Sequence, residues 1–269
     1  MEPPEPEWVD CLVRQRERFG SLVQAVFAAE GSTLLQANAA LPRWPSPDQC
    51  RDQHSPSEQA YGEAIADAQL RQLQGRASEA LELATKAHRL AKYLSDATRV
   101  AHAASLEGHI ALALGRLDHA ESALTAALWS RSGPDLRELL TEVTIDLLDL
   151  ARSRTVPPAD APMWIRMARE HAASPNTAIA LRQRLYLGLG RLALAREDPE
   201  RARRDLDQGL VLPTDQADPT WRLELQRARA EVMERQGQAA DAERLRQQAE
   251  TEAERILGAG HPQLGAAEP

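Results

Sequence analysis

The amino-acid sequence predicts an all-α protein built from repeated helical hairpins. Ala, Leu, Arg, Glu and Gln dominate the 269 residues, and all five are good helix formers. Aromatic residues make up only 4% of the chain, and the alternating β-branched runs that form strands are nearly absent. The third observation is a recurring alanine that opens the second apolar stretch of each unit, with spacings of 40 or 41 residues. These alanines are Ala80, Ala120, Ala161, Ala202 and Ala242.

Small residues also recur at fixed distances from these alanines. Seven positions later stand Ala87, Ala127, Ala168, Gly209 and Ala249, and twelve positions earlier stand Ala68, Gly108, Asp149, Gly190 and Ala230. Two antiparallel helices that cross closely need Ala or Gly on both sides, because larger side chains would collide there. One hairpin cannot bury its apolar stripe alone. We therefore expect about five hairpins stacked side by side.

The breaks in the apolar periodicity predict ten helices in five pairs. Glycines mark three of the turns inside a pair, and Pro199 suits the first turn of a helix. The third pair is irregular, because Asp149 replaces a small residue and two prolines follow Val156. The expected helices are Glu58–Gln74, Ala77–Tyr93, Asp96–Leu114, Leu117–Ser130, Asp135–Ser153, Ala159–Ala173, Thr177–Arg196, Pro199–Leu210, Pro219–Gln236 and Ala239–Leu257.

The first 56 residues differ from the repeats. Trp8–Glu30 has the pattern of an amphipathic helix, and Leu41–Pro47 forces an extended, proline-rich turn. We expect residues 1–56 to form a helical cap on the open end of the stack. Residues 57–262 are the predicted repeat array, and residues 263–269 are the predicted flexible tail.

The repeat pattern resembles the tetratricopeptide repeat. The resemblance rests on the small-residue skeleton, for example Gly108, Gly115, Ala120 and Ala127. The usual period of that repeat is about 34 residues, so the longer period here indicates longer helices or connections. Leu257–Pro262 is similar to the linker of long-period repeats of the kinesin-light-chain type. The resemblance implies a right-handed superhelical solenoid whose first helices line a concave, partner-binding groove.

A second resemblance covers the chain from Cys11 onward. Cys11–Arg18, Ser21–Val23, Ala39–Pro42 and Cys50 are similar to a segment of large bacterial serine/threonine kinases of the myxobacterial kind. In that family a kinase domain and a membrane span precede a tetratricopeptide array. This chain has no Gly-rich phosphate loop, His-Arg-Asp or Asp-Phe-Gly motif, so it departs from the family there.

The two cysteines, Cys11 and Cys50, are therefore of interest. Their spacing alone leaves both a disulfide and two buried thiols open, with the thiols favoured. The kinase resemblance implies a module outside the cytoplasm, where a Cys11–Cys50 disulfide could persist. We expect a periplasmic location if the chain is part of a membrane-anchored kinase, and a cytoplasmic one if the chain is complete.

The tetratricopeptide layout assigns eight polar residues to the groove. The arginines among them present a planar donor fork that suits carboxylates of a peptide or protein partner. A solvated face without a partner is the alternative interpretation. The candidate residues are His102, Ser105, His109, Asp146, Arg184, Arg191, Arg227 and Glu231.

Several function classes are disfavoured. The sequence has no run of about 18 apolar residues, so it predicts no membrane span. A net charge of -8 without a long basic run disfavours nucleic-acid binding. His102 and His109 are seven residues apart, too far for a metal pair on one helix. Gly188–Ala193 matches a dinucleotide fingerprint but follows no strand, so we expect no cofactor. The sequence thus favours a non-catalytic scaffold that binds proteins or peptides; the alternative is the sensor or regulatory portion of a bacterial serine/threonine kinase.

Overall fold

The computed structural model describes Gly20 and residues 55–130, 136–213 and 219–257. All regular secondary structure within these ranges is α-helical apart from one residue of 3-10 helix at Leu136. The all-α prediction is therefore confirmed for this part of the chain. The predicted cap, the Cys11–Cys50 pair and the tail after residue 257 lie outside the described residues.

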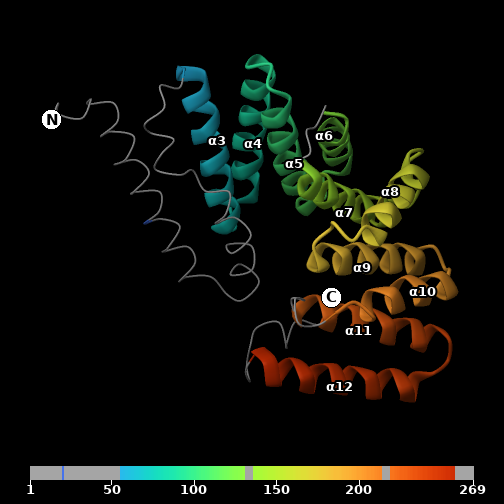
Figure 1. Cartoon of the computed structure of the whole chain (residues 1–269). Helices are drawn as coiled ribbons and strands as arrows, with labels where there is room; N and C mark the ends of the chain where they lie inside the picture. The colour runs from blue at the N-terminus through green and yellow to red at the C-terminus, as the bar shows by residue number, and fades with distance from the viewer. Residues whose placement is uncertain (1–19, 21–54, 131–135, 214–218, 258–269) are drawn as a thin grey trace. The chain divides into compact units, whose positions relative to one another are not determined.

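The chain divides into two compact units, Met1–Arg131 and Ser132–Pro269, and each is described by itself. The described part of the first unit holds α3 (Pro56–Leu73), α4 (Ala77–Tyr93), α5 (Ala97–Ala113) and α6 (Leu117–Trp129) (Figure 1). Each helix packs against the next one in sequence. The first unit thus contains two successive hairpins, α3–α4 and α5–α6.

The second unit contains three helix pairs. They are α7 (Arg137–Ser153) with α8 (Ala161–Ala173), α9 (Ile179–Ala195) with α10 (Pro199–Leu210), and α11 (Pro219–Arg235) with α12 (Ala239–Leu257). In addition to the contacts inside each pair, α9 packs against both α7 and α11, so the first helices of successive pairs are neighbours. In both units the helices begin and end within two residues of the predicted bounds.

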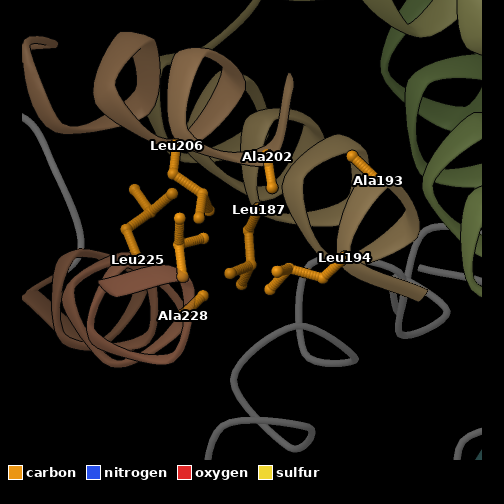
Figure 2. Packing of buried hydrophobic residues seen from close by; sticks show 8 residues of the cluster. Leu187, Ala193, Leu194, Ala202, Leu206, Leu225 and Ala228 are labelled. Carbon is orange, nitrogen blue, oxygen red and sulfur yellow. The ribbon is translucent and has the colours of Figure 1, made fainter. Parts of the chain in front are cut away.

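A cluster of leucines and alanines joins three helices of the second unit. Leu187 on α9, Leu206 on α10 and Leu225 on α11 point toward one another and are at most 3% exposed (Figure 2). Ala202 and Ala228 let the helix backbones approach at the edges of this cluster. One hairpin therefore shares its core with the first helix of the next hairpin, as stacking requires.

Local side-chain caps mark the starts of α3, α5 and α10. Ser55 and Glu58 form a capping box at α3, in which each side chain bonds the other residue's backbone N–H. The Asp96 side chain accepts from the backbone N–H of Arg99 at α5. Asp198 does the same at α10, where Pro199 occupies the first turn.

The turns inside four of the pairs use one left-handed residue at the same register. Gly75, Gly115 and Gly237 have φ angles of 72°, 68° and 80°. The following N–H closes a bond to the carbonyl five residues earlier, for example Arg116 to Ala111 at 2.9 Å. In the fourth pair this position is Glu197, with φ 59°. A non-glycine residue there carries backbone strain that glycine avoids.

The α7–α8 connection is different. Helix α7 ends at Ser153, and Arg154 is extended with ψ 134°. A longer proline-containing loop then leads to α8, and its Val156 is 77% exposed. The prolines account for the change, because proline cannot supply the N–H that closes the tight turn.

The recurring small residues lie in tight interhelical contacts. All five repeat alanines are at most 1% exposed. A Cβ on Gly108 would lie 2.6 Å from Leu124 Cγ, and one on Gly190 would lie 2.5 Å from Leu206 Cγ. Each glycine thus faces a leucine four positions after the repeat alanine.

Candidate functional site

The first helices of the second unit carry a continuous chain of charged contacts. Arg191 on α9 donates from Nη2 to Glu224 Oε2 on α11 at 2.7 Å. Arg227 donates from Nη1 to the other oxygen of the same carboxylate at 3.1 Å. Both arginines stay partly exposed, with side-chain exposures of 23% and 21%. Two predicted groove residues are therefore held together by an acid that the sequence analysis did not select.

The α7 side of this face is acidic. Burial raises the pKa of Asp149; Arg152 and Arg191 lower it, and the charge of Asp146 raises it further. Asp146 itself is 7% exposed. The charges of Asp146 and Arg191 both act on the pKa of Asp149, but little of the Asp146 side chain is open to a partner.

The other predicted residues of the second unit also have neighbours across helices. The guanidinium of Arg184 on α9 stacks 5.1 Å from the ring centroid of Trp221 on α11. Glu231 accepts from Arg235 at 2.7 Å, and Arg235 also donates to the Leu194 carbonyl of α9 at 2.9 Å. We call the surface formed by these residues on α7, α9 and α11 the first-helix face.

The three groove candidates of the first unit are less alike in exposure. His102 is exposed, His109 is half-buried, and Ser105 is 6% exposed. Ser105 lies on a buried side of α5, because Ala101 and Gly108, four residues before it and three after it, are buried as well. A partner could therefore reach His102 but would find little of Ser105.

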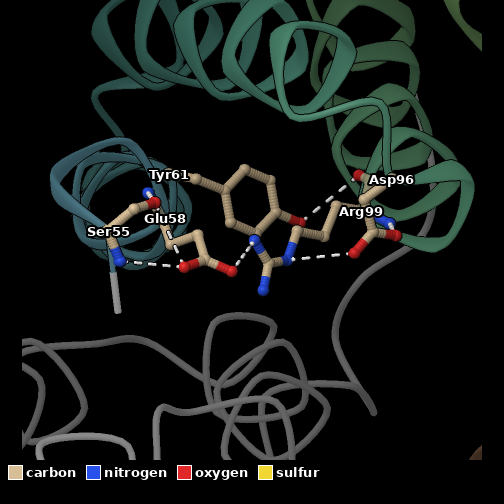
Figure 3. Close-up of polar contacts among 5 residues, drawn as sticks. All are labelled: Ser55, Glu58, Tyr61, Asp96 and Arg99. Atoms are coloured by element: carbon tan, nitrogen blue, oxygen red, sulfur yellow. Dashed lines mark hydrogen bonds and ion pairs between the residues drawn. The ribbon is translucent and has the colours of Figure 1, made fainter. Parts of the chain in front are cut away.

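A second polar cluster joins the starts of α3 and α5 (Figure 3). Arg99 lies 2.9 Å from a Glu58 oxygen and 3.3 Å from an Asp96 oxygen, and its guanidinium is 5.6 Å from the Tyr61 ring centroid. The Tyr61 hydroxyl donates to the Arg99 carbonyl at 3.3 Å. Burial raises the pKa of Tyr61 to about 12, so the phenol keeps its proton. This cluster fixes one first helix against the next.

Among residues 55–130, the most deeply buried acid is Glu107 on α5, at 4% exposure. Its carboxyl oxygens lie 2.5 Å from His88 Nδ1 on α4 and 2.6 Å from His119 Nε2 on α6. Thr85 donates to it at 2.7 Å. We call these four residues the Glu107 cluster; it links three helices, and the sequence analysis missed it.

The charge state of the cluster follows from its contacts. Burial raises the pKa of Glu107, but hydrogen bonds from His88, His119 and Thr85 outweigh burial and lower it to about 2. A carboxylate only accepts hydrogen bonds, so both facing imidazole nitrogens carry a proton. His88 Nε2, on the far side of the ring, is buried without a hydrogen-bond partner. The cluster is thus an internal carboxylate held between two basic side chains.

The remaining chemistry of the described helices is limited. Within residues 55–130, 136–213 and 219–257, no group of three or more His, Cys, Asp or Glu residues is placed to hold a metal ion. No helix in these ranges is long and apolar enough to cross a membrane. Gly188 and Gly190 lie inside α9 and face leucines of neighbouring helices instead of opening a phosphate-binding turn.

Comparison with known proteins adds no assignment. No family model matches the chain, and no curated protein matches it. The resemblances to tetratricopeptide repeats and to bacterial serine/threonine kinases therefore stay predictions that rest on the quoted residues.

Proposed function

We propose that this chain is a non-catalytic, tetratricopeptide-like repeat protein that binds a protein or peptide along its first-helix face. The proposal includes a superhelical stack of about five hairpins. One observation carries it: α9 packs against both α7 and α11, and Arg191 on α9 donates to Glu224 on α11. Repeat proteins of stacked hairpins characteristically use such extended surfaces for binding.

The chemistry of the face favours a partner with acidic residues. Glu224 occupies one donor group of Arg191 and one of Arg227. The planar donor fork of an arginine suits a carboxylate of the partner. The Arg184–Trp221 stack adds a flat, pre-oriented cation beside an aromatic ring.

A pull-down from lysate compares the wild type with Arg184→Glu and Arg191→Glu. We expect partner recovery to fall at least tenfold for both variants, because each reverses the charge that meets the partner. Arg203→Glu is the matched control: Arg203 lies on α10, a second helix, and is 43% exposed. A far-UV melting curve for each variant verifies that it is folded. Equal recovery by the wild type and both folded face variants would contradict the proposal.

A further inference from the structure

A small cavity of about 60 Å³ lies between α8, α9 and the start of α10. Its floor includes Leu189 and Leu192 of α9, which are 3% and 2% exposed. Three arginines, Arg169, Arg196 and Arg201, line it as well. We call this place the arginine notch; it lies apart from the residues that define the first-helix face.

The notch occupies the same repeat positions as the Glu107 cluster. The first position lies eight residues after the repeat alanine of one pair. The other two lie thirteen residues and one residue before the repeat alanine of the next pair. In both places these three side chains meet: around a carboxylate in the first unit and around a cavity in the second. The equivalent residues are His88 and Arg169, Glu107 and Leu189, and His119 and Arg201.

The second unit therefore keeps the two basic side chains and lacks the internal carboxylate. Leu189 stands where Glu107 stands, so nothing from α9 neutralises the arginines. Arg169 donates from one nitrogen to Asp205 at 3.2 Å and retains its other donors. Among the described residues, the side chain of Arg201 has no hydrogen bond or ion pair to a carboxylate.

One acid does line the notch, and it is already used. Asp198 caps α10 by accepting from the backbone N–H of Arg201 at 3.0 Å. With Asp205 bonded to Arg169, the local balance is three arginines against two engaged acids. The chain as a whole carries a net charge of -8, so this positive site runs against the overall charge.

We propose that the arginine notch binds an acidic side chain, of the glutamate type, from a partner peptide. The cavity of about 60 Å³ suits a carboxylate with a methylene and is too small for a nucleotide. Leu189 and Leu192 would contact the methylene, and Arg169 and Arg201 the oxygens. The inference rests on the proposed function and adds the partner chemistry and a second contact point.

The direct test uses short blocked peptides and NMR of the arginine Nε–H groups. Ac-Ala-Glu-Ala-NH2 is titrated into the full chain, with Ac-Ala-Gln-Ala-NH2 and acetate as separate arms. We expect saturable shifts of Arg169 and Arg201 with the Glu peptide, and at least tenfold weaker binding for the Gln peptide. Equal binding of the Gln peptide would overturn the proposal. If acetate binds as tightly as the Glu peptide, the notch recognises any small carboxylate, and the proposal of a peptide ligand is wrong.

Two variants test the geometry. Arg201→Ala should weaken Glu-peptide binding at least tenfold, whereas Arg203→Ala on the same helix should leave it unchanged. Leu189→Glu rebuilds the Glu107 arrangement, so it should stay folded and no longer bind the peptide. Leu187→Glu, in the leucine core of Figure 2, has no such arginines and should unfold. If Leu189→Glu unfolds as readily as Leu187→Glu, the notch does not accept a carboxylate.

The outcome for the notch is separable from that for the first-helix face. Arg184→Glu leaves the notch intact, so that variant should still bind the Glu peptide even though it loses the partner. If Arg184→Glu loses the partner and Leu189→Glu still binds it, the result contradicts the arginine notch and supports the first-helix face. If Leu189→Glu loses the partner and Arg184→Glu still binds it, the result contradicts the first-helix face and supports the arginine notch.

Discussion

Replacing Gly108 with alanine tests the packing inside a hairpin most directly. The new Cβ would lie 2.6 Å from Leu124 Cγ and 3.1 Å from the Leu124 backbone nitrogen. Rotating the leucine side chain cannot relieve a clash that includes the backbone, so α5 and α6 must move apart. Overpacking of this kind costs about 1–3 kcal/mol, while alanine gains about 1 kcal/mol of helix propensity over glycine. We expect a net loss of up to about 2 kcal/mol, against a gain where there is no clash.

The measurement is urea unfolding followed by far-UV circular dichroism. Gly62→Ala in α3 is the matched control, because a Cβ there meets nothing within 4 Å. That variant should gain up to about 1 kcal/mol from helix propensity alone. A Gly108→Ala protein as stable as Gly62→Ala would refute the packing argument.

A double-mutant cycle separates the clash from other effects. Leu124→Ala alone leaves a cavity and should cost about 2–5 kcal/mol. Adding Gly108→Ala to that variant should be neutral or stabilising, since the pair then matches Ala68 and Ala84 at the same repeat positions. The expected coupling is at least about 1 kcal/mol, the range found for residues in contact.

Three further predictions concern the turn, the Glu107 cluster and a buried amide. Glu197→Gly removes the strained φ of 59° and should raise stability by up to about 1 kcal/mol in urea unfolding; a decrease would count against the strain. The pKa of Glu107 is lowered to about 2, so its contribution, on the order of 3 kcal/mol, is present above about pH 4.5 and is lost as the pH falls toward 2. Urea unfolding between pH 5 and 2 should therefore show a steeper loss for the wild type than for Glu107→Gln, and parallel curves would disprove the assignment. Gln183 is 0% exposed with both amide atoms unpaired, so Gln183→Met should stabilise the protein by about 1–2 kcal/mol, and a lower melting temperature would be the opposing result.

The helices were predictable because their signals are local. The spacing of small residues, the turn glycines and the caps all act within one hairpin, and the observed bounds follow them within two residues. The turn at Glu197 shows the limit of this rule, since its backbone adopts the glycine conformation without glycine. The turn is closed by its own hydrogen bond, from Asp198 N–H to the Ala193 carbonyl at 3.0 Å, as in the glycine turns.

The polar clusters were harder to predict because their members come from different helices. His88 and Glu107 are 19 residues apart, and only the stacking of α4 on α5 brings them together. One signal was present: Glu107 occupies a repeat position where the later hairpin has Leu189. That signal is weak, because the same position holds Asp67 and Arg229 in two other pairs. Arg191 and Arg227 of the first-helix face both pair with Glu224. Repeat spacing alone does not single out this acid.

The glycine–leucine fit of α5 with α6 has a consequence for how such a protein can change over generations. Gly108 matches Leu124 within a single hairpin, and the first hairpin carries Ala68 and Ala84 instead. Genetic exchange at a hairpin border would pass on matched halves. Exchange inside a hairpin would join Gly to Ala or Ala to Leu, producing a void or a collision. Whole hairpins are thus better units of exchange than half-hairpins. Gly209 of α10 fits against Leu225 of α11 across a hairpin border in the same way, so successive hairpins have to match as well.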